Sequence, residues 1–474
     1  MEKCTNLKIS PSGRFIARED GSPFFWLADT AWELFHKLTR EEAVEYLATR
    51  AAQQFTAIQA VALSEFDGLS APNAYGRTPL LKNASGDFDP ALPDTRPMPS
   101  GPGMSAGNAE LPLPNEGYSY WHHVDFIVDT ACSLGLYIGL LPTWGDKYNL
   151  KWGKGPEIFT PENAYIYGKW IGARYKDRVN IVWIMGGDRP LENDTHRQIV
   201  NSMAKGIKES TDGRHLMTFH PWGGVSSSDF VHNETWLDFN MMQSGHYLKF
   251  AKNNELIQKD YALSPVKPTL DGEPRYEDTL ININRNAEDG FFDECDARMM
   301  AYWAVLSGAC GHTYGHHSVW SFYRGGSDCS EYFPPGYFIL DWRSALHRPG
   351  AEQMRHLKDL LLSRPFQELV PCQEMLADNY SGANHIAAAR GSTFAFMYSP
   401  NGLKITARMG ILDGAPVIAY WFDPRKGEYR FADLIKNEGI VSFTPPSAGR
   451  GNDWVLVLDA AAYPIPNIFS FRSR

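Results

Sequence analysis

Two carboxyl side chains stand where they could act together as a catalytic pair. Asp188 ends the apolar run 180–187, and Glu273 ends the run 267–272. Each run is typical of a buried parallel strand that opens onto a loop. Retaining cleavage of a glycosidic bond requires one carboxyl group that holds a proton and another that stays ionised. We therefore predict Asp188 as the general acid/base and Glu273 as the nucleophile.

The neighbours of both acids favour this assignment. The glycine pair at 186–187 would let a sugar approach the backbone closely. Arg189 and Arg275 each follow an acid within two residues, and an arginine beside a carboxylate keeps it charged. The alternative is that either acid caps the next helix. Glutamate is a poor N-cap and Pro274 follows directly, which weakens this alternative for Glu273.

Other polar and aromatic side chains lie at or just after the carboxyl ends of the expected strands. A strand that faces only a core should end in apolar residues, so we predict that this set lines the pocket and contacts the substrate. The alternative for the first three is a structural turn. The set is Asp29, Thr30, Trp32, Gln59, Trp144, Asp146, His220, Gln243, His246, Tyr314 and His316.

Two other hydrolase chemistries fit the sequence less well. His312, His316 and His317 raise the alternative of a catalytic metal, but metallohydrolase barrels usually carry a histidine pair on the first strand, where this chain has Asp29 and Thr30. A serine hydrolase should show a G-x-S-x-G turn after a strand, and none is present. No motif implies a cofactor.

The expected elements alternate as in a (β/α)8 TIM barrel, whose catalytic groups lie at the carboxyl ends of the strands. Thr39 and Glu42 predict a capped helix start. A doubly wound sheet is the competing architecture, but no glycine-rich phosphate loop follows the first strand. We expect the long insertion 64–117 to wall the active site. The expected strands are 24–32, 55–63, 136–144, 180–188, 215–220, 238–244, 267–273 and 311–317, with helices near 121–134, 162–176, 293–309 and 351–363.

Beyond about residue 370 the pattern changes to short strands separated by turns. The expected strands are 386–390, 393–398, 417–422 and 454–458. This pattern indicates an antiparallel β-sandwich. We therefore predict a barrel domain over 1–369 and a β-domain over 370–474.

Composition limits the classes of partner. The 474 residues are 43% hydrophobic and 21% charged, with a net charge of −10 and no lysine- or arginine-rich run, which argues against nucleic acid. No apolar stretch is long enough to span a membrane. No leader is visible, so we expect a cytoplasmic protein if Met1 is the native start, and a periplasmic or surface protein if a leader was removed. Six cysteines form no C-x-x-C pair, which argues against zinc ribbons.

Four segments together resemble the apiosidase-like barrels of glycoside hydrolase family 140, which end in a β-domain with a collagen-binding label. The segments are 26–32, 186–188, 271–274 and 311–315. The resemblance implies a retaining, endo-acting bacterial hydrolase that cleaves apiose linkages of the pectin rhamnogalacturonan II. It places the acid/base and the nucleophile on Asp188 and Glu273. Related retaining barrels usually carry Asn-Glu where this chain has Gly187-Asp188, so a shorter acid must reach the leaving oxygen.

Two rival readings are a barrel glycosidase of different sugar specificity and a non-catalytic protein that binds carbohydrate or protein through its β-domain. The second rival predicts that residues 370–474 bind alone and that the chain hydrolyses nothing. The two strand-end acids favour the enzyme.

Overall fold

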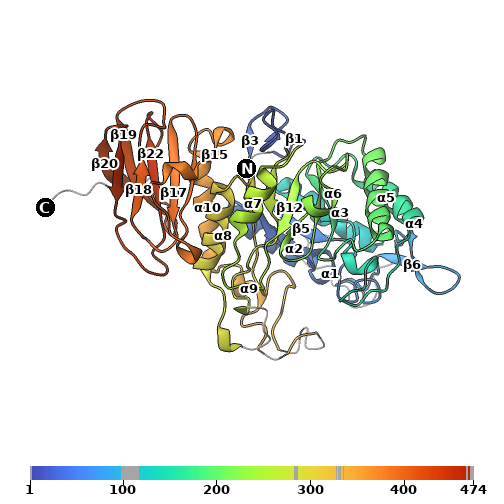
Figure 1. Ribbon diagram of the computed structural model, residues 1–474. Helices are drawn as coiled ribbons and strands as arrows, with labels where there is room; N and C mark the ends of the chain where they lie inside the picture. The colour runs from blue at the N-terminus through green and yellow to red at the C-terminus, as the bar shows by residue number, and fades with distance from the viewer. Residues whose placement is uncertain are drawn as a thin grey trace.

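The computed structural model describes residues 3–97, 117–281, 287–326, 328, 332–334, 336–465 and 468–469. Within this part of the chain, eight parallel strands curve into a barrel in the spatial order β10, β9, β8, β5, β4, β14, β13, β12 (Figure 1). Their bounds are β4 (Trp26–Thr30), β5 (Ala57–Val61), β8 (Tyr137–Leu141), β9 (Ile181–Gly186), β10 (Met217–His220), β12 (Asn240–Gln243), β13 (Thr269–Asp271) and β14 (Gly311–Tyr314). The predicted barrel is confirmed.

The barrel closes between β10 and β12 without a regular ladder. Asp238 N donates to Met217 O at 2.8 Å, and Thr218 Oγ1 donates to Phe239 O at 2.7 Å. The barrel strands are buried along their whole length, as expected of strands covered on both sides. Because the eight strands run parallel, their carboxyl ends all lie at the same end of the barrel.

Helices surround the barrel, and several begin at sequence-encoded caps. The predicted capping box of Thr39 and Glu42 is present, and Ser119, Thr160 and Asp293 begin other helices in the same way. The helices are α1 (Leu34–Lys37), α2 (Arg40–Ala52), α3 (Tyr120–Ser133), α4 (Pro161–Tyr175), α5 (Asp194–Ser210), α6 (Ser228–Val231), α7 (Asn253–Tyr261), α8 (Glu294–Leu306), α9 (Trp342–Ala345) and α10 (Pro349–Leu362). No helix in the described ranges is long and apolar enough to cross a bilayer.

Three small sheet elements accompany the barrel. The N-terminal strands β1 (Leu7–Ile9), β2 (Ile16–Arg18) and β3 (Pro23–Phe24) form an antiparallel sheet, and β11 (Val225–Ser226) pairs with β12. Part of the insertion 64–117 forms the hairpin of β6 (Leu80–Lys82) and β7 (Phe88–Pro93), where β7 packs on α4. Residues 98–116 of the insertion lie outside the described residues.

A β-domain follows the barrel and packs at one end of the molecule, drawn orange to red (Figure 1). A seven-stranded sheet faces the two-stranded sheet of β18 and β21, and apolar side chains fill the space between them. The strands are β15 (Val370–Pro371), β16 (Ala387–Arg390), β17 (Phe394–Ser399), β18 (Ile405–Arg408), β19 (Val417–Asp423), β20 (Glu428–Ile435), β21 (Ile440–Phe443), β22 (Trp454–Asp459) and β23 (Ile468–Phe469).

Helix α8 joins the β-domain to the barrel through buried polar contacts. Arg298 holds Asp453 in a bidentate ion pair at 2.8 and 2.9 Å, with both side chains at most 3% exposed. Tyr302 stacks on Tyr398 with ring centroids 4.7 Å apart. Because charges buried in this way are stable only when paired, the interface fixes the two domains to one another.

We predict that Asp453→Ala destabilises the whole chain by about 3–5 kcal/mol, because it leaves the Arg298 guanidinium charged and buried without its partner. Urea unfolding monitored by circular dichroism measures this change. Glu438→Ala, which removes a partner of the exposed Lys436 in the same domain, should change the free energy of unfolding by less than about 0.5 kcal/mol. Equal effects of the two substitutions would contradict the assignment.

Candidate active site

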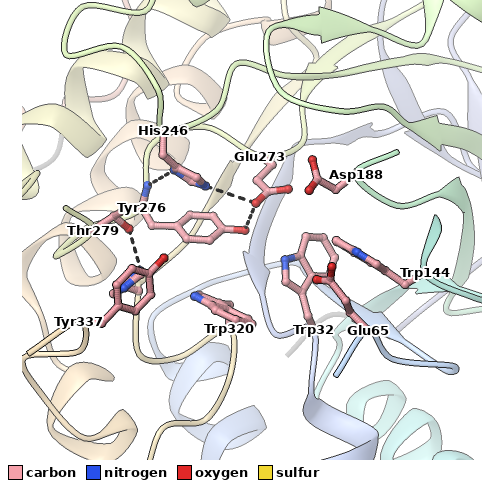
Figure 2. Close-up of a pocket in the computed structure, with 11 residues that line it drawn as sticks. Trp32, Glu65, Trp144, Asp188, His246, Glu273, Tyr276, Thr279, Trp320 and Tyr337 are labelled. Atoms are coloured by element: carbon pink, nitrogen blue, oxygen red, sulfur yellow. Dashed lines mark hydrogen bonds and ion pairs between the residues drawn. The ribbon is translucent and has the colours of Figure 1, made fainter. Parts of the chain in front are cut away.

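A cavity of about 130 Å³ opens at the carboxyl ends of the barrel strands. Asp188 follows β9 and Glu273 follows β13, and Figure 2 shows their carboxyl groups facing each other at one side of the cavity. Tryptophan rings from three loops lie opposite. The lining residues are Trp32, Glu65, Trp144, Asp188, His246, Glu273, Tyr276, Thr279, His317, Trp320 and Tyr337. The predicted catalytic pair therefore shares one pocket.

A tight turn aims Asp188 into the cavity. Gly186, Gly187 and Asp188 all have positive φ, at 89°, 119° and 48°. A Cβ on Gly186 would lie 2.5 Å from the His220 carbonyl, and one on Gly187 would lie 2.9 Å from the Trp144 ring. Protein atoms therefore occupy the space that a side chain at either position would need, while the approach of a sugar to this backbone stays a prediction. The two glycines are needed for backbone conformation and packing.

Asp188 is positioned by Arg189 and Trp152. Arg189 Nη1 lies 3.4 Å from Asp188 Oδ2, and Trp152 Nε1 donates to the same oxygen at 3.3 Å. Arg189 also pairs with Glu65. Burial and the negative charge of Glu273 raise the pKa of Asp188 to about 7, against the opposing effect of Arg189. Asp188 can therefore hold a proton near neutral pH.

Glu273 is held in the opposite state. Tyr276 donates its hydroxyl to Oε1 at 2.6 Å, His246 Nε2 donates to Oε1 at 3.3 Å, and His220 Nε2 lies 3.1 Å from Oε2. Burial opposes ionisation, but the contacts with His220 and His246 lower the pKa of Glu273 to about 2. The lowered pKa favours the ionised carboxylate at neutral pH.

The hydrogen-bond partners of Nδ1 differ between His246 and His220, and they determine which ring nitrogen carries a proton. The Tyr276 backbone N–H donates to His246 Nδ1 at 3.3 Å, so the proton of a neutral His246 lies on Nε2, toward Glu273. His220 Nδ1 lies 2.9 Å from the Pro221 carbonyl, which can only accept. His220 Nδ1 can therefore donate a proton to this carbonyl, while Nε2 faces Glu273.

Arg275 does not hold Glu273 in its charged form, contrary to the sequence-based expectation. Its guanidinium is buried and lies 3.8 Å from Asp296 and 3.4 Å from the Ala251 carbonyl. Asp296 in turn accepts from Arg450 of the β-domain at 2.8 Å. A line of charged groups thus connects the segment that carries Glu273 to the β-domain.

The structure places five of the residues predicted from sequence in the cavity wall: Trp32, Trp144, Asp188, His246 and Glu273. Two more lie directly behind it. His220 contacts Glu273, and Gln59 Nε2 donates to the Gly272 carbonyl at 2.8 Å. These two side chains contact the segment that carries Glu273.

The other six predicted substrate contacts neither line the cavity nor lie directly behind its wall, among the described residues. Asp29 accepts from Arg50 at 2.7 Å and from Tyr46 at 2.6 Å, and Asp146 pairs with Lys147 at 2.8 Å. In addition, the Tyr314 hydroxyl donates to Glu277 Oε2 at 2.6 Å, His316 Nε2 lies 3.0 Å from Asp278 Oδ2, and Thr30 and Gln243 are buried strand residues. The contacts of Asp29 and Tyr314 join a helix and a loop to the barrel strands, whereas those of Asp146 and His316 lie within and between loops.

Six lining residues are absent from the predicted pocket set, although the sequence did single out His317 in the alternative of a catalytic metal: Glu65, Tyr276, Thr279, His317, Trp320 and Tyr337. Glu65 follows β5 within a few residues, the same signal that identified the other acids, but it falls inside the expected insertion. Tyr276 lies three positions after Glu273. Trp320 and Tyr337 come from the long loop after β14, where no periodicity marks a functional position.

The histidines near β14 do not gather around a common point. His312 is buried in β14, His316 pairs with Asp278, and His317 Nδ1 contacts the Thr279 hydroxyl at 3.1 Å. No cluster of three or more metal-ligating side chains occurs within the described ranges.

A parallel barrel with two facing carboxyl groups at its carboxyl end is typical of glycoside hydrolases. The family model described as "Apiosidase-like, catalytic domain" matches residues 10–368. This chain belongs to the apiosidase-like family. A second family model, described as "Putative collagen-binding domain of a collagenase", matches residues 370–459.

Solved structures agree with this placement. A glycoside hydrolase family 5 protein from Bacteroides vulgatus ATCC 8482 is 30% identical, with a TM-score of 0.83 over 98% of this chain and 94% of that one. Another structure, described as a glycoside hydrolase, is also 30% identical, with a TM-score of 0.79 over 98% of both chains. No curated protein gives a significant match.

We predict that Glu65→Gln lowers the pKa of Asp188. The substitution removes a negative charge near Asp188 and releases Arg189 from Glu65, and both changes favour the ionised carboxylate. Carboxyl 13C NMR titration, assigned with Asp188→Asn, follows this pKa directly. Glu192→Gln, which breaks the more exposed pair with Lys151, is the control. An unchanged or raised Asp188 titration in Glu65→Gln would contradict the coupling.

Proposed function

We propose that this protein is a retaining glycosidase that cleaves apiose linkages of the pectin rhamnogalacturonan II. The observation that carries the mechanism is the pair of facing carboxyl groups with pKa values shifted in opposite directions. The apiose specificity is supported by the family to which the chain belongs. The closely placed rings of Trp32, Trp144 and Trp320 supply the apolar faces on which a sugar ring packs.

In the first step, Glu273 attacks the anomeric carbon while Asp188 protonates the departing glycosidic oxygen. The products are the free leaving-group alcohol and a covalent glycosyl ester on Glu273. In the second step, Asp188, now ionised, takes a proton from water, and the hydroxide oxygen displaces Glu273. Each residue ends in its starting protonation state.

The two acids should differ in how their removal affects the two steps. Glu273→Gln should lower turnover by several orders of magnitude on every substrate, because no ester can form. Asp188→Asn should also lower steady-state turnover, by about 10²–10⁴-fold. With a dinitrophenyl glycoside, however, it should release dinitrophenol in a burst, since this leaving group needs no proton.

Stopped-flow absorbance measures the burst, and circular dichroism checks that both variants are folded. The assignment of Asp188 and Glu273 fails if either variant keeps activity near that of the wild type. Identical kinetics of the two variants on the dinitrophenyl glycoside would show that their roles are not distinct.

Rhamnogalacturonan II should yield fragments in which apiose forms the new reducing end. Early 1H NMR spectra of the reaction should show the new anomeric centre in the configuration of the linkage that was cleaved. The opposite configuration would indicate inversion, in which a water lies between the two carboxyl groups. If the protein cleaved only other wall glycans, the assignment as a glycosidase would stand but apiose would be excluded as its sugar. Binding without hydrolysis of any glycan would favour a non-catalytic role.

A further inference from the structure

A second cavity, of about 160 Å³, adjoins the catalytic one and shares Trp320 with it. We call it the Glu33 cavity, after the residue that follows β4 by three positions. Its inner wall consists of Glu33, His36, Phe66, Trp320 and Ser321, from the segments after β4, β5 and β14. None of these side chains has a part in the two chemical steps described above.

Three buried polar atoms in this wall lack a hydrogen-bond partner among the described residues. They are Glu33 Oε2, His36 Nδ1 and Ser321 Oγ, on side chains that are 2%, 8% and 2% exposed. A buried polar atom left unpaired costs about 1–3 kcal/mol. Three such atoms beside one cavity favour a polar ligand there.

Aromatic rings also line the cavity. The Phe66 ring centroid lies 5.8 Å from that of Trp320 and 5.7 Å from that of Phe333, and Trp320 and Phe333 are 6.0 Å apart. Apolar aromatic walls with a few converging polar groups are the usual composition of a small-molecule site. A ligand that presents C–H faces and hydroxyl groups together matches both parts of the wall.

The cavity favours a ligand without charge. Burial raises the pKa of Glu33 to about 7 and lowers the pKa of His36 to about 4. Between these values both groups are neutral. At the same cavity, Lys37 and Asp328 form an ion pair at 3.3 Å, so their charges offset each other. Hydroxyl groups, which both donate and accept, suit these partners better than a carboxylate or an amine.

We propose that the Glu33 cavity binds a second, uncharged sugar residue of the substrate, next to the residue held between Asp188 and Glu273. Glu33, His36 and Ser321 hydrogen-bond its hydroxyl groups, while Phe66 and Trp320 contact its C–H faces. This subsite rests on the proposed glycosidase function and adds to it that the enzyme recognises at least two consecutive sugars.

The test measures binding in the Glu273→Gln background, where no turnover occurs. Isothermal titration calorimetry measures the affinity for each of four probes. The probes are rhamnogalacturonan II oligosaccharides, a xyloglucan heptasaccharide, an arabino-oligosaccharide and free apiose. Glu33→Gln and Ser321→Ala are each added to this background. Ser307→Ala is the matched control, because Ser307 Oγ is equally buried and unpartnered but does not line the cavity.

We expect Glu33→Gln and Ser321→Ala each to weaken binding of an oligosaccharide about tenfold, with free apiose and the Ser307→Ala control unaffected. Thermal melting checks folding, and Ser321→Ala carries the test if Glu33→Gln does not fold. If the oligosaccharide so affected lacks apiose, the subsite stands and the proposed substrate fails. Equal affinity in all variants, or no binding of any probe, would overturn the subsite, and the cavity would then hold water only.

Discussion

Two carboxyl groups that share one small cavity must not both be ionised, and the rest of the site is arranged around this electrostatic constraint. Glu273 keeps its charge because Tyr276, His246 and His220 converge on it. Its charge, together with burial, then keeps a proton on Asp188. The protonation states of the two carboxyl groups are therefore coupled. The groups that stabilise the ionised form of Glu273 also raise the pKa of Asp188 opposite it, through the charge of Glu273.

The barrel satisfies this constraint by bringing together groups that are distant in the chain. Strands β9, β10, β12 and β13 end beside one another, so that Asp188, His220, His246 and Glu273 meet although they come from four separate β/α units. The turn before Asp188 has no room for side chains at positions 186 and 187. Arg189 links this turn to Glu65 after β5. Geometry and charge at the site thus depend on the loops as much as on the strands.

The sequence was most informative where the barrel repeats a local rule. Buried strands ending in polar residues located all eight barrel strands and both acids, because strand ends face the site by topology alone. It was less informative about side-chain direction. Asp29 lies at the end of β4 and Arg275 follows β13, as the rule requires, yet their side chains contact Arg50 and Asp296. Trp320 and Tyr337 lie in a long loop whose path depends on tertiary packing, so no sequence period could identify them.

The ionic line from Arg275 through Asp296 to Arg450 has a consequence for how such proteins diversify. A β-domain joined by a flexible linker can be exchanged freely, because the catalytic domain does not depend on it. Here the β-domain supplies the cation that balances Asp296, beside the segment that carries the nucleophile. Recombination that replaced this domain would have to preserve that charge balance. The β-domain is thus part of the electrostatic environment of the segment that carries Glu273.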